Sequence, residues 1–133
     1  MTAVFLDTVG LIALWDNDDQ WHANAEAAYQ KIVSDRRLTL TTNLVLVECG
    51  NTAARRTFRS DVCLLRRTLE SRGELIEVTE QDWLAAWIAY ERGEAGQAGI
   101  VDHVSFTVMR RLGIVDAFTN DRHFQAAGFA TLF

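Results

Sequence analysis

The stretch GIVDHVSFTVMRRLGIVDAFTNDRHF, residues 99–124, decides the fold. Its first half has apolar residues at helical spacing over 100–112, and its second half, IVDAFT (114–119), is an apolar strand. DRHFQAAG (121–128) then has the composition of a short helix. The stretch thus predicts helix, strand and helix in succession. Two carboxylates flank the strand, Asp102 in the first turn of the longer helix and Asp121 just after the strand.

The rest of the chain repeats this alternation. Short apolar segments predict strands at 3–6, 38–41, 75–78 and 129–133, and the segments between them predict helices at 22–35, 43–58, 60–72 and from Thr79 onward. Strands that alternate with helices favour an α/β fold, with a mostly parallel sheet covered by helices on both faces. The chain has no proline, low-complexity tract or repeat, so residues 1–133 are expected to form a single domain.

Composition excludes several classes of protein. The 133 residues are 49% hydrophobic and 23% charged, which is typical of a globular protein and not of a disordered one. No apolar run is long enough to span a membrane, and the start lacks the basic segment of a signal peptide. The two cysteines, Cys49 and Cys63, form no metal-binding pair and are expected to be buried, reduced thiols.

The net charge is −5, yet its distribution leaves an RNA partner open. If four of the 18 acids bind metal together, the remaining 14 acids and 13 bases give only −1. Five of the twelve arginines fall between residues 55 and 67. A local excess of arginine of this kind can contact phosphate even when the whole chain is acidic.

Four carboxylates are candidates for one site. Asp7 closes the first strand and Asp121 follows the fourth, so both belong at the carboxyl edge of the sheet, where ligands bind in such folds. Glu48 and Asp102 lie among apolar neighbours in helices. Taken singly, the three aspartates are also explained as caps or first-turn residues. Together they would repel one another unless a cation neutralises them, and oxygen ligands favour Mg²⁺ or Mn²⁺.

At this point the sequence resembles a family. FLDT, LVLVE, GIVDHVSFTVMRRLG and AFTNDRHF followed by AGF look like a PIN domain, in order and spacing over essentially the whole chain. The similarity is greatest to the VapC-like toxin ribonucleases of bacterial type II toxin–antitoxin pairs. It implies a three-layer α/β/α sandwich, a quartet of Asp7, Glu48, Asp102 and Asp121 that binds Mg²⁺ or Mn²⁺, and cleavage of RNA. It also implies a small antitoxin protein that blocks the acidic site, and a homodimer. The cytoplasmic location is expected from the two reduced cysteines.

The hypothesis for the reaction is hydrolysis of an RNA phosphodiester by a water that the cation activates. Thr8 and Thr119 are predicted to orient the acids or a phosphate. If the helix after the second strand continues to residue 58, Glu48 is followed on one face by Arg55 and then Arg59. Arg55 and Arg59, with Arg56 beside them, are predicted to bind the RNA backbone, although arginines at a solvated helix end would look the same.

Other residues are given structural or surface roles. The histidines are expected to act as hydrogen-bond partners or surface residues, with neighbouring acids raising the pKa of His103 and His123. Trp83 and Trp87 are expected in the core, and Trp15 and Trp21, which bracket an acidic loop, at a protein-interaction surface. The glycines of GEAGQAG (93–99) predict a flexible connector.

Two other functions stay open at this stage. One is a PIN nuclease of RNA processing outside a toxin system, and the other is a PIN module that binds RNA or protein without catalysis. A phosphatase of the haloacid dehalogenase type is disfavoured, because Val9 stands where its second acid would be. A receiver domain is disfavoured too, because Lys31 is the only lysine.

Overall fold

A computed structural model describes residues 2–133, and within them one five-stranded sheet forms the centre of the molecule. Every strand pair is parallel, and the strand order is β3-β2-β1-β4-β5. The strands are β1 (Val4–Leu6), β2 (Thr39–Thr42), β3 (Leu75–Ile76), β4 (Asp116–Phe118) and β5 (Ala130–Thr131). The prediction of a mostly parallel α/β sheet is confirmed.

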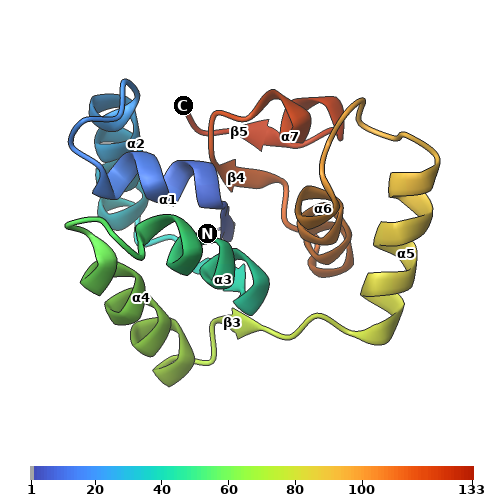
Figure 1. Cartoon of the computed structure of the whole chain (residues 1–133), viewed down its shortest axis with the longest axis horizontal. Helices are drawn as coiled ribbons and strands as arrows, with labels where there is room; N and C mark the ends of the chain where they lie inside the picture. Colours follow the sequence, from blue (N-terminus) through green and yellow to red (C-terminus); the bar gives the residue numbers. More distant parts are fainter. Residues whose placement is uncertain (1) are drawn as a thin grey trace.

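Helices form a layer on each side of this sheet, with α1 to α4 on one side and α5 to α7 on the other (Figure 1). The predicted three-layer α/β/α sandwich is therefore confirmed. The helices are α1 (Thr8–Trp15), α2 (His22–Ser34), α3 (Asn43–Ala53), α4 (Arg59–Ser71), α5 (Glu80–Glu91), α6 (Ile100–Leu112) and α7 (Arg122–Ala126).

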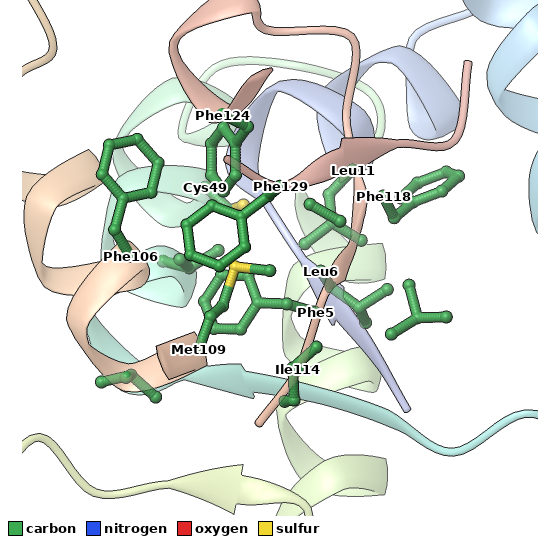
Figure 2. Close-up of a cluster of buried hydrophobic side chains, with 14 of the residues drawn as sticks. Phe5, Leu6, Leu11, Cys49, Phe106, Met109, Ile114, Phe118, Phe124 and Phe129 are labelled. Atoms are coloured by element: carbon green, nitrogen blue, oxygen red, sulfur yellow. The ribbon is translucent and has the colours of Figure 1, made fainter. Parts of the chain in front are cut away.

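The core lies between the sheet and these helices. All three residues of β1 are completely buried, as expected for a central parallel strand covered on both faces. Figure 2 shows the aromatic part of this core, in which Phe106 from α6 lies beside Phe124 from α7. Their rings meet edge to face, with centroids 4.9 Å apart. This packing fixes the positions at which α6 and α7 begin, and the acids Asp102 and Asp121 lie at those two beginnings.

The strand order reverses between β1 and β4. Leu6 pairs with Phe118, so Asp7 and Thr119 follow the two paired strands at the same edge of the sheet. In open α/β sheets the connections leave in opposite directions at such a point and open a crevice at the carboxyl ends of the strands. The topology therefore places the first and the last predicted acids together.

Helix α1 was not predicted. Its sequence, TVGLIALW, is apolar on every side and gives no helical periodicity. Gly10 allows it to lie directly against β4, because a Cβ at this position would be 2.0 Å from the Phe118 carbonyl oxygen. This close approach sets the position of the first turn of α1, which carries Thr8.

The two helices after β2 differ from the prediction at their junction. Helix α3 ends at Ala53 instead of continuing to residue 58, and α4 begins at Arg59. Phe58, not Ser60, occupies the N-cap position of α4 and provides no side-chain cap. Phe58 is buried and stacks against Trp15, with ring centroids 6.4 Å apart. Burial of this aromatic ring explains why the chain turns here without a glycine or proline.

Two expectations about burial are wrong. Trp83 and Trp87 are 37% and 47% exposed, because α5 turns Asp82 and Ala86 inward instead. Asp82 is held by two hydrogen bonds from Arg111 of α6, at 3.0 and 2.8 Å. Of the two cysteines, Cys49 is buried but Cys63 is exposed.

Within residues 2–133, no helix is both long enough and apolar enough to cross a membrane.

Candidate active site

Asp7 is the innermost of the four predicted acids and is only 2% exposed. It follows β1 directly and is the N-cap of α1, where its Oδ2 accepts a hydrogen bond from the backbone N–H of Val9 at 3.3 Å. The same oxygen accepts a second hydrogen bond from Thr119 Oγ1 at 2.8 Å. Asp7 therefore does cap a helix, as one interpretation of the sequence suggested. Burial at the strand crossover is an additional feature that capping does not require.

Asp121 approaches Asp7 from the neighbouring strand. It follows β4 and caps α7, accepting a hydrogen bond from the backbone N–H of His123 at 2.9 Å. Its own backbone N–H donates to Thr119 Oγ1 at 3.1 Å. Thr119, which is fully buried, therefore contacts Asp7 with its hydroxyl proton and Asp121 with its oxygen lone pair.

Glu48 comes from the second turn of α3, which Thr42 caps. The hydroxyl of Thr8 donates to Glu48 Oε1 at 2.7 Å and so links α1 to α3. Each of the two predicted supporting threonines thus donates a hydrogen bond to one of the four acids. An apolar environment makes such hydrogen bonds to a charged acceptor stronger than the same bond in water.

Asp102 lies in the first turn of α6, on the other side of the sheet. His123 of α7 stands between it and Asp121: Nδ1 is 2.9 Å from Asp121 Oδ1 and 3.8 Å from Asp102 Oδ2. One ligand atom from each of these three residues lies within 4.8 Å of the others. His123 was not among the predicted site residues. Its spacing, two residues after an N-cap acid, is the signal that could have placed it there.

The charges of these acids act on one another. Burial, with added repulsion from Asp102 and Asp121, raises the pKa of Asp7 to about 7 although the Thr119 hydrogen bond opposes the change. Burial also raises the pKa of Asp102 to about 6, with Asp121 and Glu48 adding to the shift and His123 opposing it. All four acids thus belong to one electrostatic cluster, as mutual repulsion requires.

No lysine or arginine neutralises this cluster within the described residues 2–133. The arginine ion pairs involve Asp16, Glu70, Asp82 and Asp116, all outside it. A buried carboxylate without a cation is costly, whereas a hard divalent cation is held by oxygen ligands of this kind. The group of Asp102, Asp121 and His123, with Asp7 and Glu48 coupled to it by charge, is rich in carboxylate oxygen and therefore fits Mg²⁺ or Mn²⁺.

The predicted arginine stripe does not continue from Glu48, because α3 ends before it. Arg55 lies exposed in the segment between α3 and α4, and Arg59 is the first residue of α4. Arg56 is paired with Asp16 at 2.8 Å and its guanidinium lies over the ring of Phe58. The prediction of a stripe aligned on one helix face is therefore wrong, although Arg55 remains exposed.

His103 also differs from the prediction. It is 2% exposed, and burial lowers the pKa of its imidazole, more than the charge of Glu94 raises it. Its ring packs edge-on against Tyr90 and Phe106, with centroids 6.1 and 5.6 Å apart. His103 is therefore a core residue and is unsuited to act as a cation at neutral pH.

With the site's geometry established, similarity to known proteins decides the family. The family model of the PIN domain matches residues 4–130, which is nearly the whole chain. The chain belongs to the PIN-domain family.

Similarity to individual PIN proteins is also extensive. The chain is 32% identical over 127 residues to the 23S rRNA-specific endonuclease VapC20 of Mycobacterium tuberculosis, in both strain CDC 1551 / Oshkosh and strain H37Rv, covering 95% of each chain. The crystal structure of M. tuberculosis VapC20, described as a sarcin–ricin loop cleaving toxin, superposes with a TM-score of 0.79 at 29% identity, covering 96% of both chains. The predicted resemblance to VapC-like PIN toxins, a class of nuclease enzymes, is confirmed.

Proposed function

We propose that this PIN protein is a divalent-cation-dependent endoribonuclease and the toxin of a toxin–antitoxin pair. The proposal is supported by the acids at the carboxyl ends of β1 and β4. Asp102, Asp121 and His123 have ligand atoms within 4.8 Å of one another, and Thr119 bonds to both Asp7 and Asp121. The charge of Glu48 acts on Asp102, and no arginine or lysine of the described residues forms an ion pair with these acids. VapC20 is named for action on 23S rRNA, and it is described as cleaving the sarcin–ricin loop. That stem-loop is therefore the first substrate to test.

In this proposal Asp7, Glu48, Asp102 and Asp121 are the catalytic acids and the metal ligands, with Mg²⁺ as the cation and Mn²⁺ as the alternative. A cation held by them supplies Lewis acidity, which lowers the pKa of a bound water and offsets negative charge on the phosphodiester. Without it the four acids would repel a phosphate group. The cation therefore has a binding role as well as a chemical one.

The chain's own residues prepare this arrangement before the substrate arrives. Thr119 fixes one oxygen of Asp7, and Thr8 fixes one oxygen of Glu48, which leaves the remaining carboxylate oxygens for the cation. Hydrogen bonds from surrounding groups commonly orient metal ligands in this way. His123 lies within hydrogen-bond distance of Asp121 and so restricts the rotation of that carboxylate.

Arg55 and Arg59 are proposed to contact the RNA backbone from the α3–α4 connection. Arg55 is exposed, and Arg59 begins α4 with one guanidinium nitrogen donating to the Ala54 carbonyl at 3.3 Å. Loss of a single-strand phosphate contact lowers the slope of log affinity against log salt by roughly 0.7. An Arg55→Ala protein whose salt slope equals that of the parent would remove Arg55 from the interface.

Further proposals follow from the VapC-like character. A small antitoxin protein binds the toxin and blocks the acidic site, the toxin forms a homodimer, and both act in the cytoplasm. Residues 1–133 act as a single PIN-like domain. Co-expression with the product of the neighbouring reading frame, followed by purification and a cleavage assay, tests the antitoxin proposal.

The function itself is tested by incubating the purified protein with 23S rRNA and with total RNA, with Mg²⁺ or with EDTA. We expect discrete cleavage that needs Mg²⁺ or Mn²⁺ and is lost in Asp102→Asn and Glu48→Gln. Glu91→Gln is the matched control, because Glu91 is an exposed glutamate at the end of α5. Cleavage by Asp102→Asn at the parental rate, or cleavage unaffected by EDTA, would contradict the proposal.

A further inference from the structure

A hollow of about 640 Å³ opens beside the acidic cluster and shares Asp121 with it. This volume lies within the range of small-molecule and cofactor sites. Four separate segments form it: the start of α1, the residue before α2, the residues between β4 and α7 with the first residue of α7, and Phe133. The lining residues are Val9, Trp21, Asn120, Asp121, Arg122 and Phe133.

Trp21 gives this hollow a flat aromatic wall. Trp21 is 44% exposed, which leaves part of its indole free to contact a ligand. The backbone that carries it is well fixed, because its N–H donates to Asp19 Oδ1 at 2.8 Å and its carbonyl accepts from Ala25 at 2.9 Å. An exposed indole on a backbone held in this way offers a face on which a nucleobase can stack.

The acidic loop before Trp21 does not oppose RNA as strongly as its sequence suggests. Asp16 is neutralised by Arg56 at 2.8 Å, and its other oxygen accepts the backbone N–H of Asp18 at 3.0 Å. Asp19 is turned toward the N–H of Trp21. The carboxylates of Asp16 and Asp19 therefore stabilise turns within the loop. Of this loop, Trp21 lines the hollow and these two aspartates do not.

The lining of the hollow also includes polar residues and a cation. Arg122 is exposed and follows Asp121 directly as the first residue of α7. Asn120, half-buried, precedes Asp121 and has an amide that can both donate and accept. A guanidinium suits a phosphate, an amide suits a base edge, and an indole suits a base face. The three lie around one hollow, at one edge of the catalytic acids.

We propose that this hollow is a nucleotide subsite for the residue next to the scissile phosphate in single-stranded RNA. The base stacks on Trp21, its edge meets Asn120, and Arg122 holds the adjoining phosphate. The inference rests on the proposed function and deepens it. RNA recognition of this kind acts on unpaired loops, whose bases are free to stack on side chains.

The test measures RNA binding and cleavage separately. The probe is a fluorescently labelled sarcin–ricin stem-loop RNA. Its binding is followed by anisotropy in Ca²⁺, which takes oxygen ligands and offsets the charge of the acids, and its cleavage is followed in Mg²⁺. We expect Trp21→Ala to raise the Kd about 10-fold, as loss of one base–aromatic stack does, and to raise KM by a similar factor with little change in kcat. Trp21→Phe should restore most of the affinity.

Arg122→Ala should lower the salt slope of binding by about 0.7, whereas Trp21→Ala should leave that slope unchanged. The matched controls are Trp87→Ala and Arg92→Ala, two exposed residues of the same types on or next to α5. If Trp21→Ala and Arg122→Ala bind and cleave RNA as their controls do, the proposal of a nucleotide subsite is refuted. Binding of a protein partner would then be the role to test for Trp21.

This outcome is distinct from failure of the proposed function. If the parent cleaves RNA and both subsite variants bind and cleave it equally well, the proposed function stands and the subsite is refuted. If Trp21→Ala and Arg122→Ala weaken RNA binding but the parent never cleaves RNA, the subsite stands and the proposed function is refuted. A protein that neither binds nor cleaves the RNA loses both.

Discussion

Thr119 Oγ1 donates a 2.8 Å hydrogen bond to Asp7 Oδ2 and joins residues 112 positions apart in the chain. The same oxygen accepts the backbone N–H of Asp121 at 3.1 Å. One buried hydroxyl therefore links the segments that follow the paired strands β1 and β4, where two of the four acids lie. Both of its hydrogen bonds are lost if the hydroxyl is replaced by a methyl group of similar size.

We predict that Thr119→Val weakens Mg²⁺ binding about 10-fold at pH 7, because a hydrogen bond to a charged group contributes about 1.5–3 kcal/mol. It should also raise the pKa of Asp7 further, since this hydrogen bond is the largest effect that lowers it. Calorimetric titration with Mg²⁺ measures the change. Thr119→Ser keeps the hydroxyl and should keep the parental Mg²⁺ affinity.

The control for this variant is Thr41→Val. Thr41 is fully buried and donates its hydroxyl to the Leu6 carbonyl at 2.7 Å, a backbone acceptor and not a carboxylate. Both variants should lower the free energy of unfolding by about 1 kcal/mol, but only Thr119→Val should weaken cation binding. Equal effects of the two variants on Mg²⁺ affinity would show that Thr119 acts through general stability alone.

Asp7→Asn should stabilise the cation-free protein while abolishing cleavage. The pKa of Asp7 is raised from 3.8 to about 7, so the folded state favours the protonated form. The stability this provides is complete below pH 4 and is lost as the pH rises through about 7. A shift of this size corresponds to about 4 kcal/mol, and Asn removes the charge while keeping the hydrogen-bonding oxygen.

Thermal unfolding in EDTA between pH 5 and pH 8.5 measures this effect. The parent's Tm should fall with rising pH, and the Tm of Asp7→Asn should exceed it at pH 8.5 by about 10 °C. Added Mg²⁺ should raise the Tm of the parent and leave that of Asp7→Asn nearly unchanged. If Asp7→Asn is less stable than the parent at pH 8.5, the charged Asp7 carboxylate does not destabilise the folded state.

Cation binding should release protons in a defined pH range. Asp7 and Asp102, with pKa values of about 7 and about 6, must lose their protons before they can bind a cation. Mg²⁺ affinity should therefore fall as the pH drops from 7.5 to 5.5, and more protons should be released at pH 6 than at pH 8.5. Titration calorimetry in buffers of different ionisation enthalpy counts these protons. Equal release at pH 6 and pH 8.5 would refute the assignment.

The sequence predicts the sheet well, and it places two of the candidate acids at one edge of that sheet, because both inferences follow from local patterns. The apolar strands at 3–6 and 114–119 each end beside a carboxylate, and the carboxyl ends of parallel strands share one edge. The convergence of Asp7 with Asp121 is therefore a consequence of topology. Glu48 was recognisable for a different reason, since its apolar neighbours leave a charged residue without solvent.

Other features depend on contacts that no local pattern encodes. Whether Trp83 or Ala86 of α5 faces inward depends on the ion pair between Asp82 and Arg111, residues on different helices. The end of α3 depends on the packing of Phe58 against Trp15. His123 joins Asp102 only because α6 and α7 begin side by side. These tertiary choices override helical periodicity, which is all that a single sequence offers.

Gly10 has no side chain, and this lack is what lets α1 lie on β4. A Cβ there would be 2.0 Å from the Phe118 carbonyl oxygen and 2.7 Å from its carbonyl carbon, and neither backbone atom can move aside easily. Gly10→Ala should therefore displace α1 from the strand, although alanine favours a helix by about 1 kcal/mol over glycine. We expect a net destabilisation of about 1–3 kcal/mol in chemical denaturation.

The displacement of α1 should also reach the site, because the first turn of α1 carries Thr8, which holds Glu48, and Asp7 caps it. We therefore expect Gly10→Ala to lose cation affinity beyond what its lower stability explains. Gly50→Ala is the matched control, since a Cβ at Gly50 of α3 would meet no atom within 4 Å, and this variant should gain stability. If Gly10→Ala were as stable as Gly50→Ala, the close packing of α1 on β4 would not be what positions Thr8 and Asp7.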